Sequence, residues 1–210
     1  MGFGCTPVAG DDGARALLDE QTFLGRRPIA HAESPCMIVL GIDPGLANTG
    51  YGVVTRRGRR MAALDGGVIE TAAGLPIERR LADVYVAVEA LLQEHAPDAV
   101  ALEELYFGQN VRTAFAVGHA RGVVMLAAGR HGVPCTGYTP QKVKSSVCGH
   151  GRAPKEQVAR MVQTLLDLPE LPTPDHAADA LAVALCHANC APLASALTTA
   201  LTPAPSAALA

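Results

Sequence analysis

Two carboxylates that end apolar runs, and a third beside a histidine, constrain this chain more than any other feature of its sequence. Asp43 follows the run MIVLGI and Glu103 follows AVAL, while His176 and Asp179 lie near the far end of the chain. A carboxylate is seldom placed at a buried strand unless it is paired or binds a metal. Because these positions are distant in sequence, they predict one acidic cluster assembled by folding. Such a cluster is typical of metal-dependent phosphodiester chemistry.

The chain is predicted to hold one folded domain between two segments without regular periodicity. Its 210 residues suit a single domain. Residues 1–36 mix Gly, Asp, Arg and Pro, and we expect them to be a disordered leader or to lie upstream of the true start. Residues 37–190 form the expected folded domain. Residues 191–210 are an Ala-, Pro-, Ser- and Thr-rich tail of low complexity, expected to be mobile.

The periodicity of apolar residues predicts an α/β fold. Three strands in an antiparallel meander are followed by alternating helices and strands, which gives a mixed five-stranded sheet flanked by helices. With the first and fourth strands as neighbours, Asp43 and Glu103 meet at adjoining strand ends, and the last helix brings up Asp179. This is the ribonuclease H-like arrangement. The expected strands are 37–43, 51–55, 61–71, 99–102 and 133–138. One expected helix begins at Pro76, and the others are 111–128, a short segment after Pro140, 154–166 and 174–188.

Charge and hydropathy limit the classes of partner. No apolar stretch approaches the ~20 residues of a membrane-spanning helix, and no hydrophobic signal region is present at the N-terminus, so we expect a cytoplasmic protein with no membrane partner. The net charge of −3 argues weakly against nucleic acid. Its distribution reverses that argument, because five basic residues and one acid lie between Lys142 and Arg160. That segment is predicted to contact phosphate.

Seven short motifs, in order from residue 37 to residue 187, resemble those of RuvC-type Holliday-junction resolvases, a family of the ribonuclease H-like superfamily. The first motif alone would be weak, since sugar kinases and actin-like ATPases open similarly. The series as a whole is specific. The motifs are GIDPG at 41–45, TGYG at 49–52, ALEE at 101–104, ARGV at 120–123, QKVK at 141–144, GHG at 149–151 and DHAADALA at 175–182.

The resemblance implies a homodimeric, structure-selective endonuclease that cuts four-way junction DNA symmetrically during recombination and repair, in cooperation with RuvA and RuvB. It also implies two Mg²⁺ ions per subunit, with Mn²⁺ as an alternative. Asp43 would be the central ligand, Glu103 would hold one ion, and Asp179 would complete the opposite side. Hydrolysis through two divalent ions needs hard oxygen ligands, which Asp and Glu supply.

His176 is predicted to join this site, although many relatives carry an acid at its position and others a histidine. His176 and Asp179 share a helix face because they are three residues apart. A neutral imidazole would ligate a metal such as Mn²⁺, whereas a protonated one would stabilise charge on the phosphate or leaving group. Asp175 competes as a ligand, but the helix dipole favours an acid in the first turn. We therefore assign His176 to the site and Asp175 to the cap.

Further positions match DNA contacts of the family. Lys144 and Lys155 would stabilise charge on phosphate, although a solvated lysine is an equal interpretation for Lys155. The glycines Gly149 and Gly151 would let backbone amides approach phosphate, with ordinary loop punctuation as the alternative. Tyr106 matches the aromatic that stacks on an unpaired base at the crossover, and base stacking contributes ~1–3 kcal/mol.

The helix at 111–128 carries a ridge of small residues that is predicted to contribute to the dimer. Ala114, Gly118 and Gly122 follow one another at intervals of four, so they line one face and allow close approach. The alternative is that this face packs against the sheet. A two-fold dimer with one site per subunit would supply the two symmetric cuts that junction resolution requires.

Three other functions compete with this prediction. A sugar kinase or actin-like ATPase would need a second phosphate-binding domain, for which the chain has no second motif and too few residues. A junction-binding module without catalysis would be expected to have lost a site acid, and none of the three is missing. A general nuclease of the same fold differs only in its substrate, and the motif series favours the resolvase.

Overall fold

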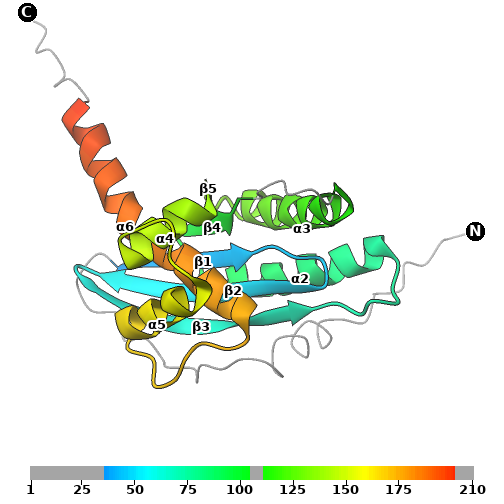
Figure 1. Ribbon diagram of the computed structural model, residues 1–210. Coiled ribbons are helices and arrows are strands. Elements are labelled where there is room, and N and C mark those ends of the chain that lie inside the picture. Colours follow the sequence, from blue (N-terminus) through cyan, green and yellow to red (C-terminus); the bar gives the residue numbers. More distant parts are fainter. Residues whose placement is uncertain (1–35, 105–110, 202–210) are drawn as a thin grey trace, which may run out of the picture.

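The computed structural model describes residues 36–104 and 111–201, which form one mixed sheet with helices on both faces (Figure 1). The strand order is β3-β2-β1-β4-β5. β1 pairs antiparallel with β2, and β2 with β3, whereas β4 runs parallel to both β1 and β5. This confirms the expected ribonuclease H-like sheet. The strands are β1 Cys36–Asp43, β2 Asn48–Arg57, β3 Arg60–Glu70, β4 Ala99–Glu103 and β5 Cys135–Tyr138.

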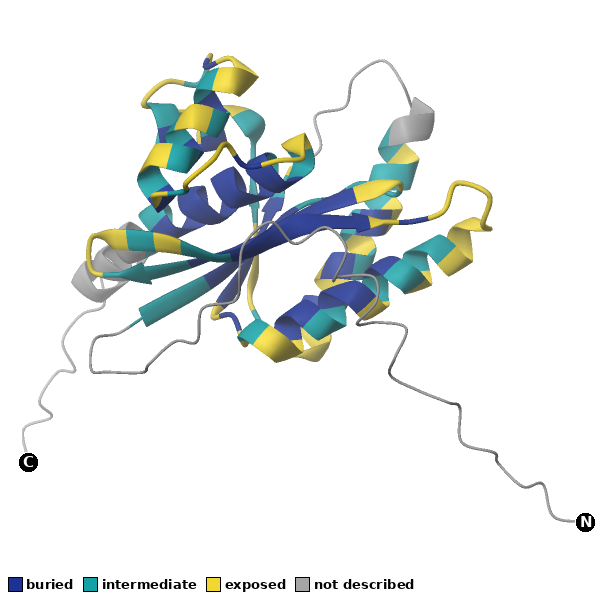
Figure 2. Cartoon of the chain, turned by 90° about the horizontal axis from the view of Figure 1, so that it is seen from below, coloured by how far each residue is buried: buried dark blue, intermediate teal, exposed yellow. Residues whose placement is uncertain are grey.

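The helices divide between the two faces of the sheet and enclose a separate apolar core on each. One core joins β1, β2 and β3 to α2 and α3, and the other joins the opposite face to α4, α5 and α6. In Figure 2 the buried residues lie along the strands and on the helix sides that face them. The helices are α2 Ile77–His95, α3 Val111–Arg130, α4 Pro140–Cys148, α5 Lys155–Leu166 and α6 Asp175–Leu201.

The predicted elements are all present, but the end predicted for the last helix is wrong. α6 continues to Leu201 rather than ending near residue 188, so it enters the segment predicted to be a mobile tail. Ala and Leu dominate this segment, and both have high helix propensity, so the chain continues the helix that the core has already nucleated. The predicted leader and the end of the tail lie outside the described residues. Among the helices of the described part, none has the length and hydropathy to cross a bilayer.

α6 lies so close to the sheet that only glycines fit beneath it. A Cβ on Gly41 would overlap the carbonyl oxygen of Ala180, and a Cβ on Gly50 would overlap that of His176. Gly52, which pairs with Gly41 across β1 and β2, also faces α6, and a Cβ there would overlap the side chain of Leu181. These glycines belong to the first two motifs, and their missing side chains bring the backbone of α6 against the two strands.

We predict that Gly41→Ala lowers the free energy of unfolding by about 1–3 kcal/mol, because the added methyl group forces α6 away from β1. Urea denaturation measures the change. Gly74→Ala is the matched control, since a Cβ at Gly74 meets no atom within 4 Å in the part of the chain that the structure describes. Equal stability of the two variants would mean that α6 does not pack closely on β1 at Gly41.

Candidate active site

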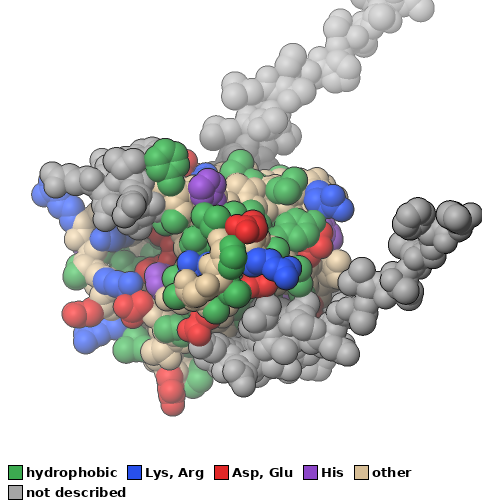
Figure 3. Space-filling view, turned by 90° about the vertical axis from the view of Figure 1, so that its right-hand side faces the viewer, with side chains coloured by type: hydrophobic (Ala, Val, Ile, Leu, Met, Phe, Trp, Pro, Cys, Tyr) green, Lys and Arg blue, Asp and Glu red, His purple; other side chains and the backbone are tan. Residues whose placement is uncertain are grey.

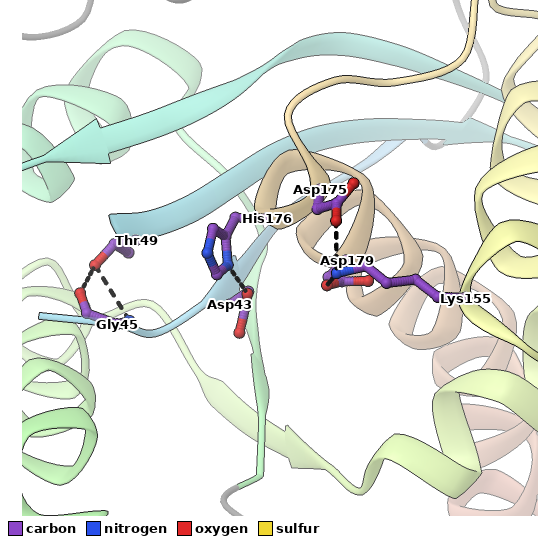
Figure 4. A network of polar contacts seen from close by, with 7 residues as sticks. All are labelled: Asp43, Gly45, Thr49, Lys155, Asp175, His176 and Asp179. Atoms are coloured by element: carbon purple, nitrogen blue, oxygen red, sulfur yellow. Dashed lines mark hydrogen bonds and ion pairs between the residues drawn. The ribbon is translucent and has the colours of Figure 1, made fainter. Parts of the chain in front are cut away.

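The acidic residues singled out from the sequence meet at one edge of the sheet. Asp43 is the last residue of β1 and Glu103 the last of β4. The two strands are parallel, with Ile42 opposite Leu102, so their carboxyl ends lie side by side. α6 begins over this edge, and it carries His176 and Asp179, three residues apart, in its first turns (Figure 4). Folding therefore brings these four predicted residues together.

His176 and Asp43 contact each other directly. The ring Nδ1 of His176 lies 2.8 Å from Oδ2 of Asp43, and only 18% of the Asp43 side chain is exposed. An ionised carboxylate can only accept, so Nδ1 carries the proton and donates it. In the neutral ring the lone pair then sits on Nε2. Asp43 therefore sets both the orientation and the tautomer of His176.

Lys155 holds the other side of the acidic group. Its Nζ lies 3.0 Å from Asp179 and 3.3 Å from Asp175 (Figure 4). Burial lowers the pKa of Lys155, but the hydrogen bonds and charges of the two aspartates outweigh it, and the net shift is upward. Lys155 is therefore an ion-paired residue and not simply a solvated lysine at a helix start. Asp175 lies in the first turn of α6, as predicted.

Glu103 shows that negative charge at this edge is incompletely balanced. Burial, followed by the charges of Asp43 and Asp179, raises the pKa of Glu103 to about 8. Burial also raises the pKa of Asp179, although Lys155 opposes the shift. These carboxylates can stay ionised together only if additional positive charge enters the site.

The donor set fits a hard divalent cation. Among the described residues, no three His, Cys, Asp or Glu side chains form a metal-binding group as they stand. His176 pairs with Asp43, and Lys155 pairs with both Asp175 and Asp179. Three carboxylates and one imidazole nevertheless converge there, and the raised pKa of Glu103 marks a place where a cation would replace a proton.

Two adjoining cavities open on the acidic group. The first, of about 360 Å³, is lined by Asp43, Gly45, Glu103 and His176 among others. The second, of about 250 Å³, also reaches Glu103 and has Lys144, Lys155 and Asp179 in its wall. The predicted phosphate contacts Lys144 and Lys155 therefore line a hollow beside the acids.

The glycine loop after α4 is placed less favourably for the role predicted from the sequence. Gly149 ends α4 in a left-handed conformation with φ 82°, and its amide donates to the carbonyl of Ser145. A Cβ on Gly151 would lie 3.1 Å from Oγ of Ser145. Gly149 is therefore explained by its place at the end of the helix, which was the alternative to phosphate contact. Phosphate contact by this loop stays a prediction. Tyr106 lies outside the described residues.

Two further side chains support the site and were given no role in the sequence predictions. Thr49 is fully buried, and its hydroxyl donates to the carbonyl of Gly45 at 2.5 Å, which closes the turn after Asp43. Arg121 of α3 donates to the carbonyl of Glu103 at 2.6 Å. Their membership of the TGYG and ARGV motifs was the sequence signal for both, and the contact of Arg121 joins residues 18 apart, which no local pattern indicates.

Comparison with known proteins agrees with this geometry. The family model "Crossover junction endodeoxyribonuclease RuvC" matches residues 39–187. The protein of that name from Moorella thermoacetica is 54% identical over 156 residues, which cover 74% of this chain and 93% of the relative. Its counterpart from Ruminiclostridium cellulolyticum is 50% identical over 153 residues, covering 73% and 92%.

Among solved structures, T. thermophilus RuvC in complex with a Holliday junction substrate superimposes with a TM-score of 0.73 at 42% identity. The match covers 76% of this chain and 97% of that one. Sequence, fold and site geometry therefore agree, and the chain belongs to the crossover junction endodeoxyribonuclease RuvC family.

Proposed function

We propose that this chain is a metal-dependent endonuclease that resolves Holliday junctions by paired, symmetric cuts in recombination and repair. The observation that carries the proposal is the convergence of Asp43, Glu103, His176 and Asp179 at one edge of the sheet, beside cavities with lysines in their walls. The substrate class comes from the family and from the T. thermophilus relative described with a junction. Cooperation with RuvA and RuvB, and a cytoplasmic location, rest on the sequence predictions.

Asp43, Glu103 and Asp179 would hold Mg²⁺, two ions per subunit, with Mn²⁺ as the alternative. When bound, such ions lower the pKa of a water nucleophile and neutralise charge on the phosphate oxygens. Asp43 is hydrogen-bonded to His176, and its charge raises the pKa of Glu103, so it interacts with both neighbours and would suit the role of central ligand. Filling the site would relieve the repulsion that raises the pKa of Glu103.

His176 and the lysines would act on the phosphate from opposite sides of the acids. Because Asp43 fixes the His176 ring, Nε2 is available either to ligate a metal or, when protonated, to stabilise charge on the scissile phosphate. Lys155 now balances the charge of Asp179, and together with Lys144 it would contact phosphate in the neighbouring cavity. Their part is to position the strand and to stabilise developing charge.

The open face of α3 would form the homodimer. Beyond its own helix, a Cβ added at Gly118 or Gly122 would meet no atom of the described residues within 4 Å, which argues against the alternative that this ridge packs on the sheet. Phe115, Met125 and Leu126 lie on the same side of the helix and are 66%, 48% and 58% exposed. Large apolar side chains beside open glycines favour a second copy of α3 as the occupant, because a two-fold axis lets small residues face each other.

We predict that Asp43→Asn abolishes cutting of a synthetic four-way junction, lowering the rate at least about 10³-fold, while junction affinity stays within about threefold. A linear duplex of the same sequence tests selectivity, and EDTA tests the metal. Glu170→Gln, a change to an exposed acid outside the site, is the control. Cutting by Asp43→Asn near the normal rate would contradict the metal site, and equal cutting of duplex would leave only a general nuclease.

The raised pKa of Glu103 gives a pH prediction for the metal-free protein. Between the ordinary pKa of 4.5 and about 8, folded Glu103 keeps a proton that the unfolded chain releases, so the folded state binds more protons. Stability therefore falls as pH rises through this window. In EDTA, the free energy of unfolding measured with urea should decrease across it, and Glu103→Gln should flatten the decrease.

Magnesium provides the companion test. At about pH 8, millimolar Mg²⁺ should raise the Tm of the unmodified chain, because the ion binds only the folded site. Glu103→Gln should lose most of this rise, and Glu170→Gln should keep it. An equal rise in Tm for all three proteins would show that Glu103 does not hold the ion.

We predict that Gly122→Arg converts the dimer to a folded monomer, because the new side chain occupies space that is open in one subunit. Analytical ultracentrifugation should report the monomer, and far-UV circular dichroism should report an unchanged helix content, since replacing glycine within a helix favours helix formation. Gly74→Arg, in the loop before α2, is the control and should stay dimeric. A dimeric Gly122→Arg protein would place the interface elsewhere.

A further inference from the structure

A third cavity continues from the acidic site on the side away from Lys144 and Lys155. It has a volume of about 470 Å³, and its wall includes the loop 45–48, Arg80 of α2 and Val117 of α3. Gly45, Val117 and His176 line both this cavity and the one that contains Asp43. The three cavities therefore follow one another, with lysines on one side of the acids and Arg80 on the other.

The guanidinium of Arg80 is held in place by a chain of hydrogen bonds. Its Nε donates to Oγ1 of Thr71 at 2.8 Å, and the Thr71 hydroxyl donates to the carbonyl of Leu46 at 2.6 Å. The amide of Thr71 also donates to the carbonyl of Ala47 at 3.0 Å. Thr71 is 9% exposed, so this anchor is shielded from solvent. The side chain of Arg80 is thus fixed against the loop that follows Asp43.

The outer nitrogens of Arg80 keep their hydrogen-bonding capacity. Within residues 36–104 and 111–201, only the bond from Nε to Thr71 engages this side chain. Arg80 is also the one Lys or Arg among the described residues that line this cavity. A guanidinium anchored at Nε presents its remaining N–H groups as a fork, which matches the geometry of two phosphate oxygens.

The surrounding surface makes such a single contact important. On the face shown in Figure 3, the visible basic and acidic side chains are interspersed with hydrophobic ones. The third cavity itself has Arg80 as its one Lys or Arg side chain among the described residues, so a DNA strand in it would meet one such cation. Each phosphate that is neutralised contributes separately to affinity and to its dependence on salt.

We infer that Arg80 binds a backbone phosphate of the cut strand, on the side of the scissile phosphate opposite to Lys144 and Lys155. The inference rests on the proposed function, because it takes the acidic edge as the place of cutting. Arg80 and the lysines then hold the strand at two points and keep the phosphate between them over the acids. Arg80 is a positioning residue in this arrangement and does not contact the reacting atoms.

The first experiment measures the affinity of the full chain for a labelled synthetic four-way junction in EDTA at several salt concentrations. Arg80→Ala should weaken binding about tenfold and reduce the slope of log affinity against log salt by about 1. Arg80→Lys keeps the charge and should keep the slope. Arg79→Ala, which removes an exposed arginine outside the cavity, is the matched control and should keep both. An unchanged slope in Arg80→Ala overturns the inference.

The second experiment separates phosphate binding from a purely structural role of Arg80 in holding the loop 45–48. Junctions carrying a single neutral methylphosphonate at each position around the cut are compared for affinity. One position should weaken binding by the unmodified chain and by Arg79→Ala, but not by Arg80→Ala. A second position should weaken binding by the unmodified chain but not by Lys144→Ala, and this position should lie on the other side of the cut. Equal penalties in Arg80→Ala and in the unmodified chain at every position overturn the inference.

These measurements also separate the inference from the proposed function. Failure of the unmodified chain to cut the junction in Mg²⁺ would refute the proposed function, whereas the coupling of Arg80 to a phosphate is measured without metal and without cutting. If Arg80→Ala proves unfolded by its Tm, Arg80→Lys replaces it. The shorter, unforked side chain should then reduce the methylphosphonate penalty at the same single position, and an unreduced penalty overturns the inference.

Discussion

The close packing of α6 against β1 and β2 is the constraint on which the rest of the structure depends. Gly41 and Gly50 leave room for backbone where other residues would place a side chain, so the first turns of α6 lie directly over the ends of the strands. This contact carries His176 to within hydrogen-bonding distance of Asp43. A helix held at the more usual spacing by larger side chains would leave His176 and Asp179 too far from the strand ends to share a ligand.

The close packing of acids produces repulsion between carboxylates, and the basic side chains of the site balance it only in part. His176 donates a hydrogen bond to Asp43 and Lys155 balances the charge of Asp179, while Glu103 is left between two negative charges with a raised pKa. The folded protein therefore stores repulsion at the place where we propose that metal binds. Removing one carboxylate would stabilise the metal-free fold while destroying its proposed chemistry, which is a common trade-off between stability and function at active sites.

α3 links the proposed dimer face to the acidic edge. Its open side carries Gly118 and Gly122, and its Arg121 donates to the carbonyl of Glu103. A second copy packed on the open side would hold α3 in place and, through Arg121, steady the end of β4. Arg80 performs a comparable task from α2, because its bond to Thr71 supports the loop after Asp43. The two helices on one face of the sheet thus stabilise the two strand ends that carry acids.

The sequence by itself determined the strands, their mixed order and the identity of the acidic residues, because apolar periodicity and short motifs are local signals. It also predicted that β1 and β4 are neighbours, from which the meeting of Asp43 and Glu103 follows. It placed the end of α6 too early, since the low complexity of the tail concealed its helix propensity. Only the tertiary structure decided the hydrogen bond between His176 and Asp43, the ion pairs of Lys155 and the anchoring of Arg80 and Arg121. Each of these joins residues from different elements, and their distances depend on how closely helices pack on the sheet, which no local pattern encodes.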